Sequence, residues 1–325
     1  MTVPLLETRG LTKLYPARQG LLGERRFLRA VDGVDLRLDE GETLGLAGES
    51  GCGKSTIAKL LMNLIPPTEG SISFQGKRLD LLGKEELFAF RRQVQMIFQD
   101  PQASLNPRMR VGDIIGEPLK IHRLTAKGEY HDRVLELMRR VGLHDDYFNR
   151  YPHEFSGGQR QRIGIARALA VQPRIIIADE PVSALDISIQ AQIINLLQEL
   201  RRDFGLSMLF IAHDLSVVRH LSSSIAIMYL GKIVERGGGD AVFNRFLHPY
   251  TQALISAIPK LSPVKKGERI ILKGDLPSPL SPPSGCPFHP RCRHGESICS
   301  REIPALEEKE PGHWAACHFS GKLFR

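Results

Sequence analysis

The stretch GESGCGKST, Gly48 to Thr56, decides the fold of this chain. It has the pattern G-x-x-x-x-G-K-S of a phosphate-binding loop, and it stands between an alternating run that ends at Ala47 and a helical apolar pattern that starts at Ile57. Glycines let the backbone wrap a phosphate, and the N–H groups and the positive end of the following helix face the anion. We expect Lys54 to reach the β- and γ-phosphates and the Ser55 hydroxyl to ligate Mg²⁺.

The composition is that of an ordinary globular protein with a basic surface. Of the 325 residues, 42% are hydrophobic and 25% are charged, and the net charge is +8. The sequence holds no apolar run of about 18 residues, and its first residues lack the features of a secretory signal. We therefore expect a location in the cytosol. The charge is compatible with anionic ligands, phospholipid headgroups or nucleic acid, and it does not choose among them.

Polar residues follow two predicted strands. A continuous apolar run from Ile175 ends in Asp179 and Glu180, which is typical of a parallel strand buried on both faces. Because α/β sheets bind ligands at this end of a strand, Asp179 suits the Mg²⁺ shell and Glu180 suits a general base that orients water. A pair of solvated carboxylates is the alternative. Gln99 follows a predicted strand at 94–98; it can contact metal and water there, or be a plain loop residue.

A second glycine pair lies in the stretch SGGQ, Ser156 to Gln159, before a predicted helix at 163–170. This is another anion-binding helix end, where Ser156 can donate to a phosphate. A Gly-Gly loop with a serine cap and no ligand is the alternative. His213 follows a further predicted buried strand, and a single histidine at such a place is more often structural than catalytic.

The remaining pattern indicates the surroundings of these motifs. Residues 5–38 are predicted as strand, loop and strand, and Tyr15 in the loop can stack on a base or lie on the surface. The region from about 105 to 155 is predicted to be mostly helical, and residues 224–235 to be a hairpin. One predicted helix face in that region consists of Val134, Leu137, Met138 and Val141.

Together these motifs resemble the nucleotide-binding subunit of an ABC transporter, over about residues 5–259. They occur in the family's order: the phosphate loop, the Gln99 loop, the signature at Ser156, the Asp179-Glu180 strand, the Asp186 loop and the His213 switch. The resemblance implies an α/β P-loop NTPase fold of ABC type, with a mixed core sheet, N-terminal antiparallel strands and an inserted helical subdomain at about 102–160. The nucleotide-binding domain is expected at 1–258 and a small, loop-rich C-terminal extension at 259–325.

The resemblance also implies individual roles in binding and hydrolysing ATP. It makes Glu180, His213 and Gln99 catalytic, and Ser55, Gln99 and Asp179 ligands of Mg²⁺. The residues implied in nucleotide binding are Tyr15 (stacked on adenine), Gly48, Ser50, Gly51, Cys52, Gly53, Lys54, Ser55, Thr56, Ser156, Gly157, Gly158, Gln159 and Asp186. The side chain of Cys52 is interpreted as a small packing group.

Several stretches narrow the resemblance to the peptide and nickel permease branch. These are Leu14–Pro16, Phe98–Pro107, Ser156–Arg162 and His248–Leu254, and the tail 276–288 is similar to the F-type ATPase subunit of dipeptide and oligopeptide permeases. The implied function is ATP hydrolysis that powers peptide uptake, with nickel or another small solute as the alternative cargo. The implied partners are a second ATPase subunit, two permease subunits and an extracytoplasmic binding protein, and the implied location is the cytoplasmic face of the inner membrane.

In this family the open face of a bound ATP is closed by the signature loop of the partner ATPase subunit. The resemblance therefore implies that Ser156 and Gly158 serve an ATP held by the partner, in a dimer that we expect to be a heterodimer. Buried phosphate charges would be satisfied only when the two subunits meet.

Four of the five cysteines lie in the tail, at Cys286, Cys292, Cys299 and Cys317. In a cytosolic chain such a cluster indicates metal before disulfide. Four thiolates can hold Zn²⁺ or a [4Fe–4S] cluster, and some relatives in the peptide branch carry the cluster, so it is the prediction. Zinc, with ligation also from His289, His294, His313 or His318, and free or redox-active thiols are the alternatives.

Two other classes fit less well. ABC ATPases that act on nucleic acid or ribosomes usually carry two ATPase domains in one chain, or a long insertion between phosphate loop and signature, and neither is present. A metal-storage or metal-sensing protein would leave the ATPase motifs without a role.

Overall fold

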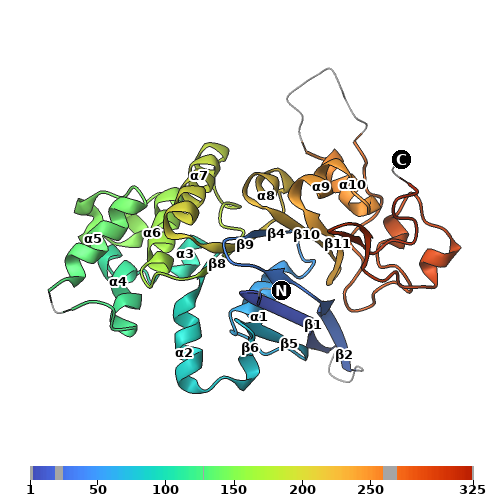
Figure 1. The fold of residues 1–325 in the computed structure, drawn as a ribbon. Coiled ribbons are helices and arrows are strands. Elements are labelled where there is room, and N and C mark those ends of the chain that lie inside the picture. The colour runs from blue at the N-terminus through green and yellow to red at the C-terminus, as the bar shows by residue number, and fades with distance from the viewer. Residues whose placement is uncertain (1–2, 19–24, 127, 259–268, 324–325) are drawn as a thin grey trace. The chain divides into compact units, whose positions relative to one another are not determined.

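The computed structural model describes residues 3–18, 25–126, 128–258 and 269–323 (Figure 1). The chain divides into two compact units. The first unit comprises Met1–Leu38, Thr43–Asp80 and Ala212–Arg325, and the second comprises Asp39–Glu42 and Leu81–Ile211. Within the described residues, no helix combines the length and the apolar character needed to cross a bilayer.

The first unit contains an antiparallel sheet near the N-terminus. Its strands run in the order β2 (Arg25–Val34), β1 (Leu6–Arg18), β5 (Glu69–Phe74) and β6 (Lys77–Arg78), and β3 (Arg37–Leu38) also pairs with β1. Leu11 of β1 lies opposite Val34 of β2, and both side chains are buried. The two predicted strands of this region are therefore confirmed, with apolar residues facing the core, whereas Tyr15, predicted in the loop between them, lies in β1.

A second set of strands in the first unit carries the phosphate loop. β4 (Thr43–Ala47) is buried along its whole length, because it pairs in parallel with β10 (Ser224–Tyr229) in the interior. β10 and β11 (Lys232–Gly238) form the predicted hairpin, which is confirmed. The loop joins β4 to α1 (Lys54–Leu61), which buries Ile57, Leu60 and Leu61 at helical spacing.

The second unit is built on parallel strands. They run in the order β9 (Ser207–Ala212), β8 (Ile175–Asp179) and β7 (Val94–Ile97), and every residue of β8 and β9 is buried. Ile177 in β8 lies level with Met96 on one side and with Leu209 on the other. The long apolar runs of the sequence therefore fill a sheet interior, and β8 ends in the polar residue Asp179.

The helices of the second unit are α2 (Lys84–Gln93), α3 (Pro101–Ser104), α4 (Val111–Ile121), α5 (Tyr130–Arg140), α6 (Gly157–Leu169) and α7 (Ile187–Phe204). Figure 1 shows α4, α5 and α6 grouped together. α5 buries Val134, Leu137 and Met138, as predicted. α4 and α5 approach closely, since a Cβ on Gly116 would lie 2.2 Å from the hydroxyl of Tyr130.

The C-terminal part of the first unit begins with α8 (Leu215–Leu221), α9 (Gly239–Asn244) and α10 (Pro249–Ser256). Residues 269–323 follow, mostly as loops and short turns, and they add β12 (Glu307–Glu310) and β13 (His313–Ala315). β13 pairs with β11. The boundary predicted at residues 258 and 259 adjoins residues 259–268, which lie outside the described residues, and it stays a prediction.

A buried acid–histidine pair fastens this C-terminal segment to β11. The carboxylate of Glu235 lies 2.8 Å from Nε2 of His313, and neither side chain is more than 1% exposed. The same carboxylate accepts the backbone N–H groups of Leu247 at 2.7 Å and His248 at 3.0 Å. Because a buried carboxylate needs such donors, the three contacts hold the middle of β11, the start of α10 and β13 together.

Candidate functional site

The backbone of the phosphate loop needs glycine at two places. Gly48 and Gly53 have φ values of 156° and 113°, in the left-handed range. A Cβ on Gly48 would lie 2.2 Å from the carbonyl oxygen of Met228, and one on Gly53 would lie 2.1 Å from that of Ala30. The loop is therefore pressed against the backbones of β10 and β2, which leaves no room for a side chain.

Lys54 lies inside this loop as the first residue of α1. It is 4% exposed, and its Nζ donates to the carbonyl oxygens of Gly48 at 2.8 Å and Glu49 at 3.0 Å. Ser55 follows it in the first turn of the helix. A buried ammonium and a helix N-terminus at one loop suit a phosphate group, so the residues present fit the nucleotide that the motif predicts.

Cys52 fills space behind the loop. Its side chain is 1% exposed, and its carbonyl oxygen accepts the N–H of Gly231 at 2.9 Å. Burial raises the pKa of its thiol. These features agree with a packing role for the side chain.

In the second unit the structure brings together Gln99 and Glu180, which stand 81 positions apart. Nε2 of Gln99 donates to the Glu180 carboxylate at 3.1 Å. Gln99 follows β7, and Asp179 and Glu180 occupy the end of the neighbouring β8. Asp179 is 4% exposed and Glu180 is 9% exposed, so both carboxylates are withdrawn from solvent.

Glu180 has an unusual backbone conformation for a residue with a side chain. Its φ is 46°, in the left-handed region, which costs energy for residues other than glycine. Its N–H donates to the carbonyl oxygen of Ile211 at 2.9 Å, and its own carbonyl oxygen accepts from the Ser183 hydroxyl at 3.1 Å. These contacts hold the strained residue and aim its carboxylate toward Gln99.

The signature residues Ser156 to Gln159 form a capped helix start. The Ser156 hydroxyl accepts the N–H of Gln159 at 3.3 Å, and the Gln159 side chain accepts the N–H of Ser156 at 3.0 Å. A Cβ on Gly158 would lie 2.5 Å from Cγ2 of Ile189, and one on Gly157 would lie 3.2 Å from Leu185. The signature therefore packs against the segment around Asp186, which occupies the N-cap position of α7.

The other predicted residues lie in the first unit. Tyr15 is half-buried in β1 opposite Leu28, with Nζ of Lys13 at 5.4 Å from its ring. His213 is exposed directly after β9. The first unit thus supplies Tyr15, the phosphate loop and His213, and the second unit supplies Gln99, Asp179, Glu180, the signature and Asp186.

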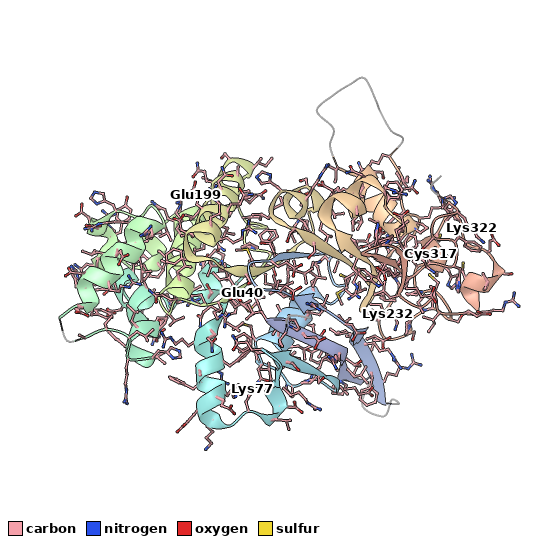
Figure 2. All side chains as sticks on the ribbon, viewed as in Figure 1. Glu40, Lys77, Glu199, Lys232, Cys317 and Lys322 are labelled. Atoms are coloured by element: carbon pink, nitrogen blue, oxygen red, sulfur yellow. The ribbon has the colours of Figure 1, made fainter. Side chains whose placement is uncertain are left out.

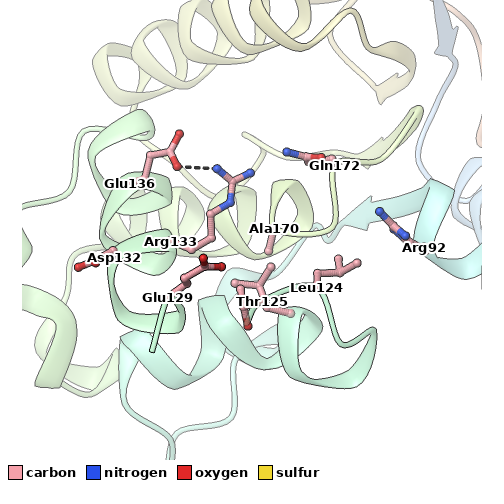
Figure 3. A pocket seen from close by; sticks show the side chains of 10 residues that line it. Arg92, Leu124, Thr125, Glu129, Asp132, Arg133, Glu136, Ala170 and Gln172 are labelled. Atoms are coloured by element: carbon pink, nitrogen blue, oxygen red, sulfur yellow. Dashed lines mark hydrogen bonds and ion pairs between the residues drawn. The ribbon is translucent and has the colours of Figure 1, made fainter. Parts of the chain in front are cut away.

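A pocket of about 470 Å³ lies among the helices of the second unit (Figure 3). Charges of both signs line it, and Arg133 and Glu136 form an ion pair there. It contains none of the predicted site residues. Its lining consists of Arg92, Leu119, Leu124, Thr125, Glu129, Asp132, Arg133, Glu136, Ala170 and Gln172.

The prediction of a [4Fe–4S] cluster in the tail is wrong. Among the residues that the structure describes, no group of three or more His, Cys, Asp or Glu side chains is placed to hold a metal ion. Burial raises the pKa of the Cys286 thiol to about 11 and also raises the pKa values of Cys292 and Cys317 (Cys317 is labelled in Figure 2). All five cysteines, Cys299 included, are free.

The histidines considered for zinc have other partners. Nε2 of His313 lies against Glu235, and Nδ1 of His289 lies 2.9 Å from the carbonyl oxygen of Cys286. Nε2 of His318 lies 3.1 Å from the carbonyl oxygen of Glu302, and Nε2 of His294 accepts from Arg293 at 3.0 Å. None of these histidines belongs to a described group of side chains that could hold a metal ion, so the residues do not fit the cluster.

Sequence reasoning assigned no role at the phosphate loop to two residues that contact it, Arg291 and Tyr250. Arg291 pairs with Glu49 in the loop, and the Tyr250 hydroxyl accepts the N–H of Glu49 at 2.8 Å. Glu49 occupies a variable place in the loop motif, so a charge at that place was the sole signal in the sequence.

Comparison with known proteins finds matching family models and relatives that are similar over nearly the whole chain. Residues 31–183 match the family model "ABC transporter", and residues 234–299 match "Oligopeptide/dipeptide transporter, C-terminal region". The oligopeptide transport ATP-binding protein AppF of Bacillus subtilis is 53% identical over 320 residues, which cover 97% of each chain. The dipeptide transport ATP-binding protein DppF of Escherichia coli is 48% identical over 97% of this chain and 94% of its own length.

The same similarity extends to solved structures. A dimeric, post-hydrolysis structure of the ATP-binding cassette MJ0796 bound to ADP and Pi is 31% identical, with a TM-score of 0.64. It covers 72% of this chain and 98% of its own chain. The predicted ABC-type P-loop NTPase fold, with its mixed sheet and helices, is confirmed, whereas the cysteine module of that prediction is not. The chain therefore belongs to the ABC transporter family, as an ABC-type ATPase of the branch with the oligopeptide/dipeptide transporter C-terminal region.

Proposed function

We propose that this chain hydrolyses ATP to power the uptake of oligopeptides or dipeptides through a membrane permease. The main support for ATP hydrolysis is the hydrogen bond between Gln99 and Glu180, because it orients a buried carboxylate at the end of a parallel strand. Relatives about half identical over nearly the whole chain are named for oligopeptide or dipeptide transport, which supports peptide cargo. These names do not favour the nickel alternative.

The roles proposed for the site follow from the chemistry of each group. Lys54 and the N–H groups of the phosphate loop hold the β- and γ-phosphates, and Tyr15 stacks on adenine. Ser55, Asp179 and the amide oxygen of Gln99 supply oxygen ligands for Mg²⁺, which neutralises phosphate charge when bound.

Two further residues act on the reaction itself. Glu180 accepts the proton of the attacking water, a role suited to a carboxylate that the Gln99 amide orients. His213 is proposed to contact the terminal phosphate as the switch histidine.

A second ATP-binding subunit completes each site in this proposal. Ser156 and Gly158 would contact an ATP held by that subunit, in a heterodimer. Two permease subunits bind the ATPases, and an extracytoplasmic binding protein delivers the cargo. The chain would then sit peripherally on the cytoplasmic face of the inner membrane.

The test is transport by the reconstituted complex. The chain is purified with its permease and partner ATPase, placed in liposomes with its binding protein, and assayed for ATP hydrolysis and uptake. We expect short peptides to stimulate both activities and Ni²⁺ to stimulate neither. Stimulation by Ni²⁺, or hydrolysis that no peptide couples to uptake, would contradict the assignment of cargo.

A further inference from the structure

An arginine of the C-terminal segment reaches the phosphate loop. The guanidinium of Arg291 donates to both carboxylate oxygens of Glu49, at 2.6 and 3.0 Å, and 242 positions separate the two residues. The Arg291 side chain is 7% exposed and that of Glu49 is 29% exposed. A two-pronged, largely buried contact of this kind fixes geometry as well as charge.

An aromatic cluster holds Arg291 in place. Its guanidinium carbon lies 6.0 Å from the ring centroid of Tyr229. The Tyr229 ring makes edge contacts with Tyr250 and Phe288, at centroid distances of 4.7 and 5.2 Å. Hydrogen bonding to Glu49 raises the pKa of Arg291, so the arginine stays charged. Packing in this cluster therefore holds the guanidinium group of Arg291 in position.

The carboxylate, the backbone N–H and the backbone carbonyl oxygen of Glu49 each make a contact. Its carboxylate pairs with Arg291, its N–H donates to the Tyr250 hydroxyl at 2.8 Å, and its carbonyl oxygen accepts from Nζ of Lys54 at 3.0 Å. Lys54 is the residue that the loop offers to a phosphate. A displacement of Glu49 thus moves a contact of Lys54.

The charge of Glu49 matters as well as its position. A carboxylate within a loop that receives a polyphosphate repels the ligand, and the repulsion is stronger where solvent is excluded. Arg291 supplies the opposite charge at hydrogen-bonding distance. Removing the arginine leaves a negative charge beside the phosphate site.

We propose that Arg291 is a positioning residue of the nucleotide site, which neutralises Glu49 and fixes the loop from which Lys54 acts. The C-terminal segment then sets the affinity of the ATPase for nucleotide, although it lies outside the motifs of the ATP site. This inference rests on nucleotide binding at the phosphate loop, as proposed above.

The test is equilibrium binding of a fluorescent ATP analogue, with Mg²⁺, to the purified full-length chain. We expect Arg291→Met to bind about tenfold more weakly than the unmodified chain, because the partly buried carboxylate of Glu49 loses its partner beside the phosphate site. The double variant Glu49→Gln, Arg291→Met should recover most of this loss, since the neutral amide needs no counter-charge. Arg293→Met is the matched control: Arg293 lies in the same segment and donates to Gln252 at 2.9 Å.

Hydrolysis by the assembled complex gives the second readout. The KM for ATP should rise in Arg291→Met while kcat changes less, because the arginine acts on binding and contacts no reacting atom. Arg291→Lys, which keeps the charge, should bind more tightly than Arg291→Met and keeps the test valid if the methionine variant folds poorly. Unaltered binding in Arg291→Met, or a double variant as weak as the single one, would overturn the inference. Failure of the unmodified chain to bind nucleotide would instead refute the proposed function.

Discussion

The side-chain amide of Gln99 donates to the carboxylate of Glu180 at 3.1 Å, from the end of one parallel strand to the end of its neighbour. This contact ties the loop after β7 to the residue proposed as the general base. A substitution of either residue should therefore alter the position of the other side chain.

Glu180→Gln should lower the turnover of ATP by about 10²- to 10⁴-fold, the range that a general base contributes. The amide keeps the shape of the side chain and cannot accept the proton of water. We expect the variant to trap an ATP-bound, closed dimer. Phosphate release by the assembled complex and size-exclusion chromatography with ATP are the measurements. Glu199→Gln, an exposed site on α7, is the control. Retained steady-state turnover, with both sites accounted for, would count against this role.

Gly158→Ala should destabilise the second unit by about 1–3 kcal/mol, because the new methyl group meets Cγ2 of Ile189 at 2.5 Å. Urea unfolding of the full-length chain measures the loss. Gly164→Ala is the matched control in the same helix, where nothing lies within 4 Å of the added Cβ. That control should be stabilised by about 1 kcal/mol through helix propensity. Equal changes in stability at the two glycines would mean that the close contact with Ile189 does not restrict position 158 to glycine.

Acid should weaken the fold through His248. Burial lowers the pKa of this histidine from 6.5 to about 3, and its Nδ1 accepts the N–H of Tyr250 at 3.1 Å, which requires the neutral ring. Between these pH values the unfolded chain binds the extra proton, so stability is complete above about pH 6.5 and falls with the pH. The loss at pH 5 is about 2 kcal/mol.

Urea unfolding at several pH values measures the slope of the free energy of unfolding against pH. His248→Gln should remove most of it, because glutamine does not titrate, although the variant starts from a lower stability. His153→Gln, at an exposed position, is the control and should keep the slope. An unchanged pH dependence in His248→Gln would show that other groups cause it.

Cys286 should resist alkylation in the folded protein. Because burial raises its pKa from 9.0 to about 11, the thiolate that reacts is about a hundredfold scarcer than for an ordinary thiol at pH 8. Iodoacetamide labelling followed by peptide mass spectrometry measures the rate for each cysteine, with urea-unfolded protein as the reference. The folded rate should rise steeply with pH. Equal rates in folded and unfolded protein at pH 8 would contradict the buried, protonated thiol.

The sequence predicted those parts of the fold that local pattern determines. The phosphate loop, the buried strand that ends at Asp179, the hairpin of β10 and β11, and the apolar face of α5 all depend on residues close together in the chain. Spacing and hydrophobicity suffice for such features, because each is formed by neighbours in the sequence.

Contacts between distant residues were harder to predict. The charge of Glu49 in the loop motif does not indicate which residue it meets, because the fold of the 242 positions between them brings Arg291 to it. The four cysteines led to a wrong prediction for a related reason: their spacing is compatible with a metal cluster, whereas the described residues contain no group of three or more side chains placed to hold a metal ion. Whether a group of cysteines can bind a metal thus depends on where the fold places their side chains, which their spacing in the sequence does not record.

The pairing of β13 with β11 has a consequence for anyone who shortens this protein. A chain cut after α10 would lose the strand that covers β11, and its backbone N–H and C=O groups would be left as an open edge. Such an edge can pair with the same edge of another molecule, which is a common start of aggregation. The C-terminal segment therefore also protects the chain from aggregation. Aggregation of a truncated chain would thus give no evidence about the role of this segment in ATP binding.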